Sequence, residues 1–203
     1  RKDYTGNNTM DYNEILVILS NELRPARFRH CRDVSQTAVK LAERWGADIE
    51  KARLAGILHD CARNLKGEEL LKTARQYGMI PSKVESLQPA LIHAPLGAIL
   101  AECRFGVPDA QILQAIRRHT TGAVQMTLLD KIIYLADCIE PGRNFSGVRK
   151  IRDLAFENLD AAVLSAYDHS ILFIIENGGI LHPNTIEGRN FLLMELKTSR
   201  NGK

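Results

Sequence analysis

The side chains in this chain best suited to chemistry are histidines and aspartates that lie in otherwise apolar segments. The six histidines are His30, His59, His93, His119, His169 and His182. His59 is followed directly by Asp60 within the apolar stretch 54–62, and Asp137 stands in a similar stretch, 134–139. An ionisable group among apolar neighbours needs a charged partner when it is buried, and a metal cation is one such partner.

A histidine–aspartate pair alone indicates little, because it arises by chance in a chain of this composition and a lone buried histidine is often only a core residue. The wider arrangement adds to it. His30 falls in the first turn of a predicted helix, His93 begins another and His119 ends a third. Imidazole and carboxylate together suit iron, manganese, cobalt or zinc. Adjacent helical residues point about 100° apart, so His59 and Asp60 can bracket one ion or bridge two.

Helical periodicity and helix-ending residues predict the elements that position these side chains. We expect helices over 15–23, 28–45, 49–62, 68–77, 91–105, 109–118, 127–139 and 148–176, the last mostly helical in one or two pieces. A final helix is expected from the capping-box spacing of Asn184 and Glu187. No useful segment alternates with period two, so the predicted fold is all-α and single-domain.

Composition excludes several classes of protein. With 45% hydrophobic and 25% charged residues, the 203-residue chain matches a globular protein with one substantial core. The longest apolar run, 171–175, is too short to span a membrane, and the polar residues 1–9 are not typical of a signal peptide. We interpret residues 1–9 as a flexible extension. The scattered cysteines form no CxxC pair, which favours reduced thiols and a cytoplasmic location.

The net charge of +3 is confined to the two ends of the chain. The first nine residues carry +1 and the basic tail, residues 197–203, carries +3, so residues 10–196 carry −1. A nucleic-acid interface needs basic residues clustered on one face, and this distribution does not support one. We therefore expect neither a nucleic-acid nor a membrane partner.

Further motifs narrow the interpretation. In chain order they are RFRH (27–30), HDCAR (59–63), HAPLGA (93–98), RHTTG (118–122), DKIIYLAD (130–137), EPGR (140–143) and HPNTIEGRN (182–190). Together they resemble the HD-domain superfamily of metal-dependent phosphohydrolases, and within it the bacterial YqeK-type symmetrical dinucleoside tetraphosphatases. The resemblance covers about residues 10–195, so the expected domain is residues 10–196 with an all-α HD-domain fold.

The resemblance implies a metal centre and a reaction. His30, His59, Asp60 and Asp137 would hold a divalent ion, with iron expected and manganese, cobalt or zinc as alternatives. His93 and His119 would complete a second metal site or bind phosphate, and the sequence leaves this open. Metal-bound hydroxide would attack an inner phosphate of diadenosine tetraphosphate and release two ADP, with His59 and Asp60 as the catalytic residues and Asp60 also a proton acceptor.

The resemblance also implies substrate contacts around the metal. The expected nucleotide-binding residues are Asp33, Arg63, Thr120, Arg143, Leu181, His182, Asn184 and Thr185. Solvated surface charges or a helix stop are alternative interpretations for several of them, and a structural ion pair is at least as plausible for Lys131. Arg63 stands where the family more often has Lys, and Gly188 where we expect Ala, which should weaken the last helix slightly. A homodimer is a further implication.

Three other functions are compatible with these motifs. One is another HD-type hydrolysis, of nucleoside mono- or triphosphates, alarmones or cyclic dinucleotides. A second is an iron oxygenase of HD type, and a third is a nucleotide sensor without turnover. Product analysis separates the first from the favoured reaction, because only that reaction yields ADP alone.

Overall fold

The fold is built from helices alone. The computed structural model describes residues 10–201, with side chains to residue 199, so the expected extension 1–9 lies outside the described part. Within residues 10–201 the chain forms no strand, which confirms the all-α class. The helices are α1 (Tyr12–Glu22), α2 (Pro25–Trp45), α3 (Ile49–Leu58), α4 (Gly67–Gln76), α5 (Lys83–Leu87), the 3-10 turn η1 (Pro89–Ile92), α6 (His93–Cys103), α7 (Ala110–Arg118), α8 (Leu128–Ile139), α9 (Val148–Glu157), α10 (Leu159–Glu176) and α11 (Pro183–Asn201). In this described range, no helix combines the length and the apolar character that crossing a membrane requires.

Capping side chains explain where most of these helices begin. Asp48 accepts a hydrogen bond from the backbone N–H of Lys51 at the start of α3, and Asp109 caps α7 in the same way. Thr127 and Asp130 form a reciprocal capping box at the start of α8. These caps lie where the sequence predicts helix starts, so the beginnings of α3, α7 and α8 are set by local signals.

Several helix boundaries differ from the prediction. Helix α2 begins at Pro25, because proline fits the first helical position, and this places His30 in the second turn rather than the first. Helix α3 ends at Leu58 rather than at residue 62, and residues 59–64 form consecutive turns. The predicted helix 91–105 divides into η1 and α6.

The start of the last helix also differs from the prediction. Helix α11 begins at Pro183, so Asn184 lies inside the helix and is not its N-cap. The Nδ1 atom of His182 accepts the backbone N–H of Asn184 at 3.2 Å and takes the place of the predicted cap. Residues 197–201 continue α11, so this part of the basic tail is helical. The stretch 148–176 forms two helices that divide at Asn158, as one alternative allowed.

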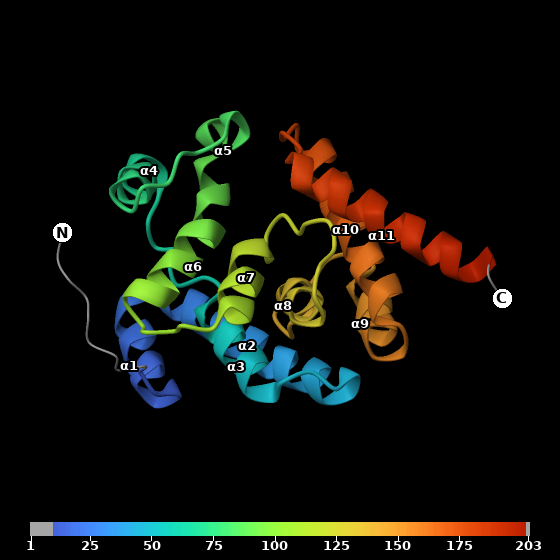
Figure 1. The fold of residues 1–203 in the computed structure, drawn as a ribbon, viewed down its shortest axis with the longest axis horizontal. Coiled ribbons are helices and arrows are strands. Elements are labelled where there is room, and N and C mark those ends of the chain that lie inside the picture. The colour runs from blue at the N-terminus through green and yellow to red at the C-terminus, as the bar shows by residue number, and fades with distance from the viewer. Residues whose placement is uncertain (1–9, 202–203) are drawn as a thin grey trace.

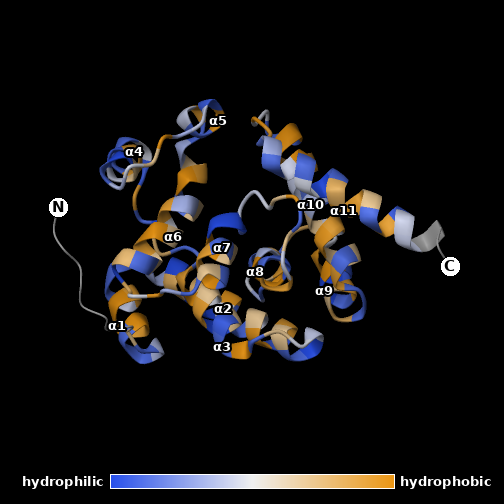
Figure 2. Cartoon of the chain, in the orientation of Figure 1, coloured by the Kyte–Doolittle hydropathy of each residue, from blue (hydrophilic) through white to orange (hydrophobic). Residues whose placement is uncertain are grey.

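Helix α8 lies at the centre of the arrangement. It packs against α2, α3, α7, α9 and α10, while α1 and α11 lie at opposite ends of the long axis (Figure 1). Its hydrophobic residues are surrounded by these neighbours (Figure 2), and Ile132, Ile133 and Leu135 are fully buried. This central position brings Asp137 of α8 to the level where α2, α3 and α7 meet.

Two contacts fix the helices that carry the histidines. A Cβ atom on Gly56 would lie 2.7 Å from the Cα of Ser35, so α2 and α3 approach one another more closely than any other residue would allow. Asp130, buried on α8, accepts hydrogen bonds from Arg118 at 2.8 Å and Gln114 at 3.0 Å on α7. The first contact sets His30 beside His59, and the second sets His119 beside Asp137.

Candidate metal centre and its surroundings

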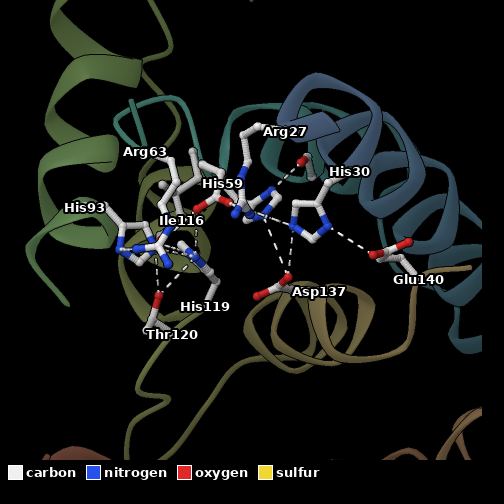
Figure 3. Close-up of polar contacts among 12 residues, drawn as sticks. Arg27, His30, His59, Arg63, His93, Ile116, His119, Thr120, Asp137 and Glu140 are labelled. Atoms are coloured by element: carbon white, nitrogen blue, oxygen red, sulfur yellow. Dashed lines mark hydrogen bonds and ion pairs between the residues drawn. The ribbon is translucent and has the colours of Figure 1, made fainter. Parts of the chain in front are cut away.

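Four histidines and two aspartates from separate elements converge beside α8. They are His30 on α2, His59 and Asp60 after α3, His93 at the start of α6, His119 at the end of α7, and Asp137 on α8. Figure 3 shows the four imidazole rings in a row with Asp137 beside them. The Nε2 atoms of His30 and His59 are 3.2 Å apart, and those of His93 and His119 are 3.1 Å apart. The six residues predicted to bind metal or phosphate are therefore brought together; we call these six residues the ligand cluster.

Each imidazole is oriented through its other ring nitrogen. His59 Nδ1 lies 2.7 Å from the carbonyl oxygen of Gly56, and His119 Nδ1 lies 2.7 Å from that of Ile116. His93 Nδ1 contacts the carbonyl of Ala90 in the same i−3 relation. These carbonyls belong to the last turns of α3, α7 and η1, which lack partners within their own helices. A histidine placed just after each helix end thus satisfies a carbonyl and fixes its own ring.

The resulting tautomers leave the Nε2 atoms free to bind a cation. A carbonyl oxygen accepts a hydrogen bond, so the Nδ1 atoms of His59 and His119 carry the hydrogen and their Nε2 atoms carry lone pairs. The carbonyl of Ala90 favours the same tautomer for His93. The Nδ1 atom of His30 faces the carboxylate of Glu140 at 3.1 Å, which favours the same tautomer. Facing lone pairs repel one another unless a cation lies between them. This donor set, oriented by second-sphere acceptors, fits a divalent metal.

Asp60 faces both halves of the cluster. Its Oδ2 atom lies 3.5 Å from Nε2 of His59 and 3.8 Å from Nε2 of His30. Its Oδ1 atom lies 3.2 Å from Nε2 of His93 and 3.7 Å from Nε2 of His119. Ligand atoms compatible with one ion occur in three overlapping groups, and Asp60 belongs to two of them. Asp60 is therefore placed so that it can face one ion or bridge two.

Burial and charge set the ionisation of the cluster. Burial lowers the pKa of His59 to about 4, against a partial opposing effect of Asp60, so this ring is neutral at pH 7. Burial alone would raise the pKa of the Asp60 carboxyl, but His59, His119 and His93 outweigh it and hold that pKa well below its usual range. The same balance, through His30 and Arg143, lowers the pKa of Asp137. Burial also lowers the pKa of His93, whereas Asp137 and Glu140 outweigh burial and raise the pKa of His30. Ionised carboxylates and neutral imidazoles bind metals, so a metal on His30 would replace the proton that these two carboxylates favour.

Three arginines surround the ligand cluster. Arg27 donates from Nη1 to Asp60 Oδ2 at 2.6 Å, and Arg63 Nη1 lies 3.0 Å from His93 Nδ1 and donates to the carbonyl of Ala90. Arg143 donates to the carbonyl of Asp137 at 2.8 Å and pairs with its carboxylate. The predicted positions of Arg63 and Arg143 beside the cluster are thus observed.

Other predicted contacts divide into near and far groups. The hydroxyl of Thr120 lies 3.0 Å from Nε2 of His119 and 3.1 Å from Nε2 of His93, so it belongs to the centre. Among the described residues, no hydrogen bond or ion pair joins the cluster to the more distant members of the predicted set, Asp33, Leu181, His182, Asn184 and Thr185. Thr185 is buried, and its N–H donates to the carbonyl of His182.

Sequence reasoning missed Arg27 and Glu140. Both lie in motifs that the resemblance quoted, but their partners are 33 and 110 residues away, so no local pattern points to them. Lys131 forms the structural ion pair expected from the sequence as the alternative to substrate binding, because it pairs with Asp160 at 2.7 Å. His169 stacks on Phe145 with ring centroids 3.8 Å apart and lies outside the ligand cluster.

Comparison with known protein families finds a match over the region that holds the ligand cluster. The family described as HD domain matches residues 27–142. This range includes the whole ligand cluster, Arg27 and Arg63, and ends one residue before Arg143. The chain belongs to the HD-domain family. Members of this family bind divalent metal, and the cluster described above is able to hold it.

Individual HD-domain relatives agree over nearly the full chain. A Bacillus subtilis protein named symmetrical bis(5'-nucleosyl)-tetraphosphatase is 39% identical, over 91% of this chain and 98% of its own. A protein of the same name from Halalkalibacterium halodurans is 37% identical, over 93% and 100%. The crystal structure of an HD superfamily hydrolase from Clostridium acetobutylicum, described as involved in NAD metabolism, is 43% identical, with a TM-score of 0.90 over 93% of this chain and 100% of that one.

Proposed function

We propose that this HD-domain protein hydrolyses diadenosine tetraphosphate symmetrically into two ADP. The observation that carries the proposal is the ligand cluster, in which four Nε2 atoms and the two oxygens of Asp60 face one another. The names of the full-length relatives from Bacillus subtilis and Halalkalibacterium halodurans supply the reaction. The cluster alone supports a metal-dependent hydrolase, and the relatives narrow its substrate.

His30, His59 and Asp137 would hold one divalent ion with Oδ2 of Asp60, and His93 and His119 a second with Oδ1 of Asp60. Bound ions supply a Lewis acid for phosphoryl oxygens and lower the pKa of coordinated water. Mixed imidazole and carboxylate ligands suit iron, which we propose, with manganese, cobalt or zinc as alternatives. Because the pKa of Asp60 lies well below its usual range and both its oxygens face imidazoles, we assign Asp60 to metal binding rather than to proton acceptance.

The surrounding side chains would bind the tetraphosphate. Arg63 and Arg143 present guanidinium groups beside opposite halves of the cluster, and the Thr120 hydroxyl stands between His93 and His119. Such groups neutralise charge that develops on phosphoryl oxygens during transfer. We propose that Leu181, His182, Asn184 and Thr185 contact a nucleoside, because they lie at the start of α11, where the helix N-terminus carries partial positive charge. Asp33 would contact a ribose.

The test is product chromatography with protein purified anaerobically and analysed for metal. We expect ADP as the sole nucleotide product from diadenosine tetraphosphate, with iron present at about two ions per chain. The His59→Ala variant should retain its helical circular dichroism and lose ADP release. Release of ATP with AMP, or near-normal activity in the variant, contradicts the proposal.

NAD belongs in the same experiment as a competing substrate. The Clostridium acetobutylicum structure is described as involved in NAD metabolism, and NAD is also a dinucleotide joined through phosphates. Hydrolysis of NAD at a higher kcat/KM than diadenosine tetraphosphate would replace the proposed substrate while leaving the metal centre intact.

A cytoplasmic location and a homodimer complete the proposal. All four cysteines are free thiols in the structure, which agrees with a reducing compartment. Light scattering of the purified chain tests the homodimer, which only the resemblance implies.

A further inference from the structure

A second cationic region adjoins the ligand cluster and is not used by the contacts proposed so far. It is a cavity of about 330 Å³ between the beginnings of α2 and α4. Four of its lining residues are cationic: Arg24, Arg27, Arg63 and Lys66. Among the described residues that line it, none is acidic. We call this cavity the basic pocket.

The basic pocket is separated from the ligand cluster by two of its own arginines. Arg27 lines the pocket and donates to Asp60, and Arg63 lines the pocket and contacts His93. Both arginines lie across the cluster from Asp137 in the view of Figure 3. An anion in the pocket would therefore lie one side chain away from the proposed metal ions.

The other two cations of the basic pocket are not neutralised. Within residues 10–199, no carboxylate pairs with Arg24 or Lys66, whereas Arg27 pairs with Asp60. Two unpaired cations held beside Arg27 and Arg63 repel one another and favour binding of an anion.

Helix geometry adds to the positive potential. Arg24 is the N-cap of α2 and Lys66 is the N-cap of α4, and neither helix start is capped by a side chain. Helix N-termini carry partial positive charge, so a basic residue there is unfavourable by itself. Glu68 and Glu69 stand in the first turn of α4 but do not line the pocket, and α2 has no acidic residue in its first turn. The exposed basic side chains at both helix starts therefore add to the positive potential of the pocket.

The proposed substrate has a second diphosphate group, which needs a cationic binding site such as the basic pocket. Symmetrical cleavage breaks the bond between the two central phosphates, so a nucleoside diphosphate extends from the metal ions in each of two directions. The segment at the start of α11 is proposed for one of these halves. Gln88 lies between the two regions, because its side-chain amide faces the backbone of Ile180 while the next residues, Pro89 and Ala90, line the basic pocket.

We propose that the basic pocket binds the phosphates of the second nucleoside diphosphate half, with Arg24 and Lys66 as its binding residues. This inference rests on the proposed function. A pocket at a fixed place beside the ligand cluster would hold one half of the substrate so that the central bond lies at the metal ions. Arg24 and Lys66 would thereby favour cleavage into two equal products.

The experiment compares two double variants. The Arg24→Ala/Lys66→Ala variant removes both unpaired cations from the pocket. The Lys72→Ala/Arg75→Ala variant removes the same two residue types from exposed positions of α4 that lie outside it. Equilibrium dialysis of the metal-loaded proteins with ADP gives the number of sites, and steady-state assays give KM and kcat for diadenosine tetraphosphate.

We expect wild type and the exposed-face variant to bind two ADP per chain and the pocket variant to bind one. We also expect KM to rise at least about tenfold in the pocket variant only. One ADP per chain in wild type, or equal ADP binding and KM in both variants, overturns the pocket. If wild type does not cleave diadenosine tetraphosphate but the pocket variant still loses one of two ADP sites, the pocket stands and the proposed function fails.

Discussion

The ligand cluster and the start of α11 differ in how firmly their side chains are held. In the cluster, the Nδ1 atom of each imidazole contacts a carbonyl or carboxylate oxygen. Arg27 and Arg143 form ion pairs with the two aspartates. At the start of α11, His182 is bound only to the backbone beside it, and Leu181 and Asn184 contact no part of the cluster within the described chain. This difference indicates that the metal-binding part is formed in advance, and we expect the proposed nucleoside-binding segment to be completed by its ligand.

The largest effect should come from removing the charge that joins both halves of the cluster. Asp60→Asn keeps the volume of the side chain but removes one anionic oxygen from the pair that faces four histidines. We expect ADP release to fall at least about a thousandfold and the bound metal to decrease, because the ions lose their shared ligand. Initial rates and metal analysis measure both.

Asp160→Asn is the matched control for this variant. Asp160 pairs with Lys131 away from the cluster, so its loss should leave rate and metal content near wild type. Activity of Asp60→Asn within tenfold of wild type would show that the two halves do not depend on Asp60.

The next largest effect should come from metal removal, which acts on the cluster and not on the start of α11. The cluster holds two carboxylates and four close imidazoles, and a bound ion relieves the repulsion among their lone pairs. With ion concentration about a thousandfold above Kd, chelation should lower Tm by about 10 °C. Differential scanning calorimetry with and without chelator measures the shift. An unchanged Tm would show that the cluster is stable without cations.

The sequence predicted the ligand cluster better than its surroundings for a physical reason. The starts of α3, α7 and α8 are encoded locally, by Asp48, Asp109 and Thr127. The cluster histidines His59 and His119 directly follow the C-terminal ends of α3 and α7, of which the sequence predicted only that of α7. Once α3 and α7 end at these residues, the i−3 carbonyls orient the rings without help from distant parts of the chain. The composition of the cluster and most of its framework therefore follow from local signals and the family motifs.

The parts of the site that the sequence did not predict depend on packing between segments that are distant in the chain. The bonds from Arg27 to Asp60 and from Glu140 to His30 join residues that no periodicity relates. The basic pocket likewise arises only when the starts of α2 and α4 meet. At the start of α11, the capping-box prediction was wrong because Pro183 begins the helix one residue before Asn184 and His182 supplies the acceptor. The fixed φ of Pro183 suits the first position of a helix, and this outweighed the capping-box spacing of Asn184 and Glu187.

A smaller effect is expected where α11 is seated on the rest of the fold. Gly188 was expected to weaken this helix, but a Cβ there would lie 2.5 Å from the Tyr167 hydroxyl and 2.7 Å from the carbonyl oxygen of Ala123. Gly188→Ala should therefore lower stability by about 1–3 kcal/mol in spite of alanine's helix propensity. Urea unfolding measures the change. Glu187→Ala, at an exposed position of α11, should not reproduce it, and a stabilised Gly188→Ala variant would contradict the close packing.

The smallest effect should come from His182, because the segment that carries it is completed by the ligand. His182→Ala removes a side chain whose hydrogen bond is to the backbone N–H of Asn184 and not to the ligand cluster, so metal content and Tm should remain near wild type. Loss of one hydrogen bond to a nucleoside should raise KM for diadenosine tetraphosphate about threefold to tenfold and leave kcat nearly unchanged. His169→Ala serves as the control histidine outside the proposed site and should not change KM. A large fall in kcat with altered metal content would place His182 with the ligand cluster, and the distinction between a preformed centre and a ligand-completed segment would then fail at this residue.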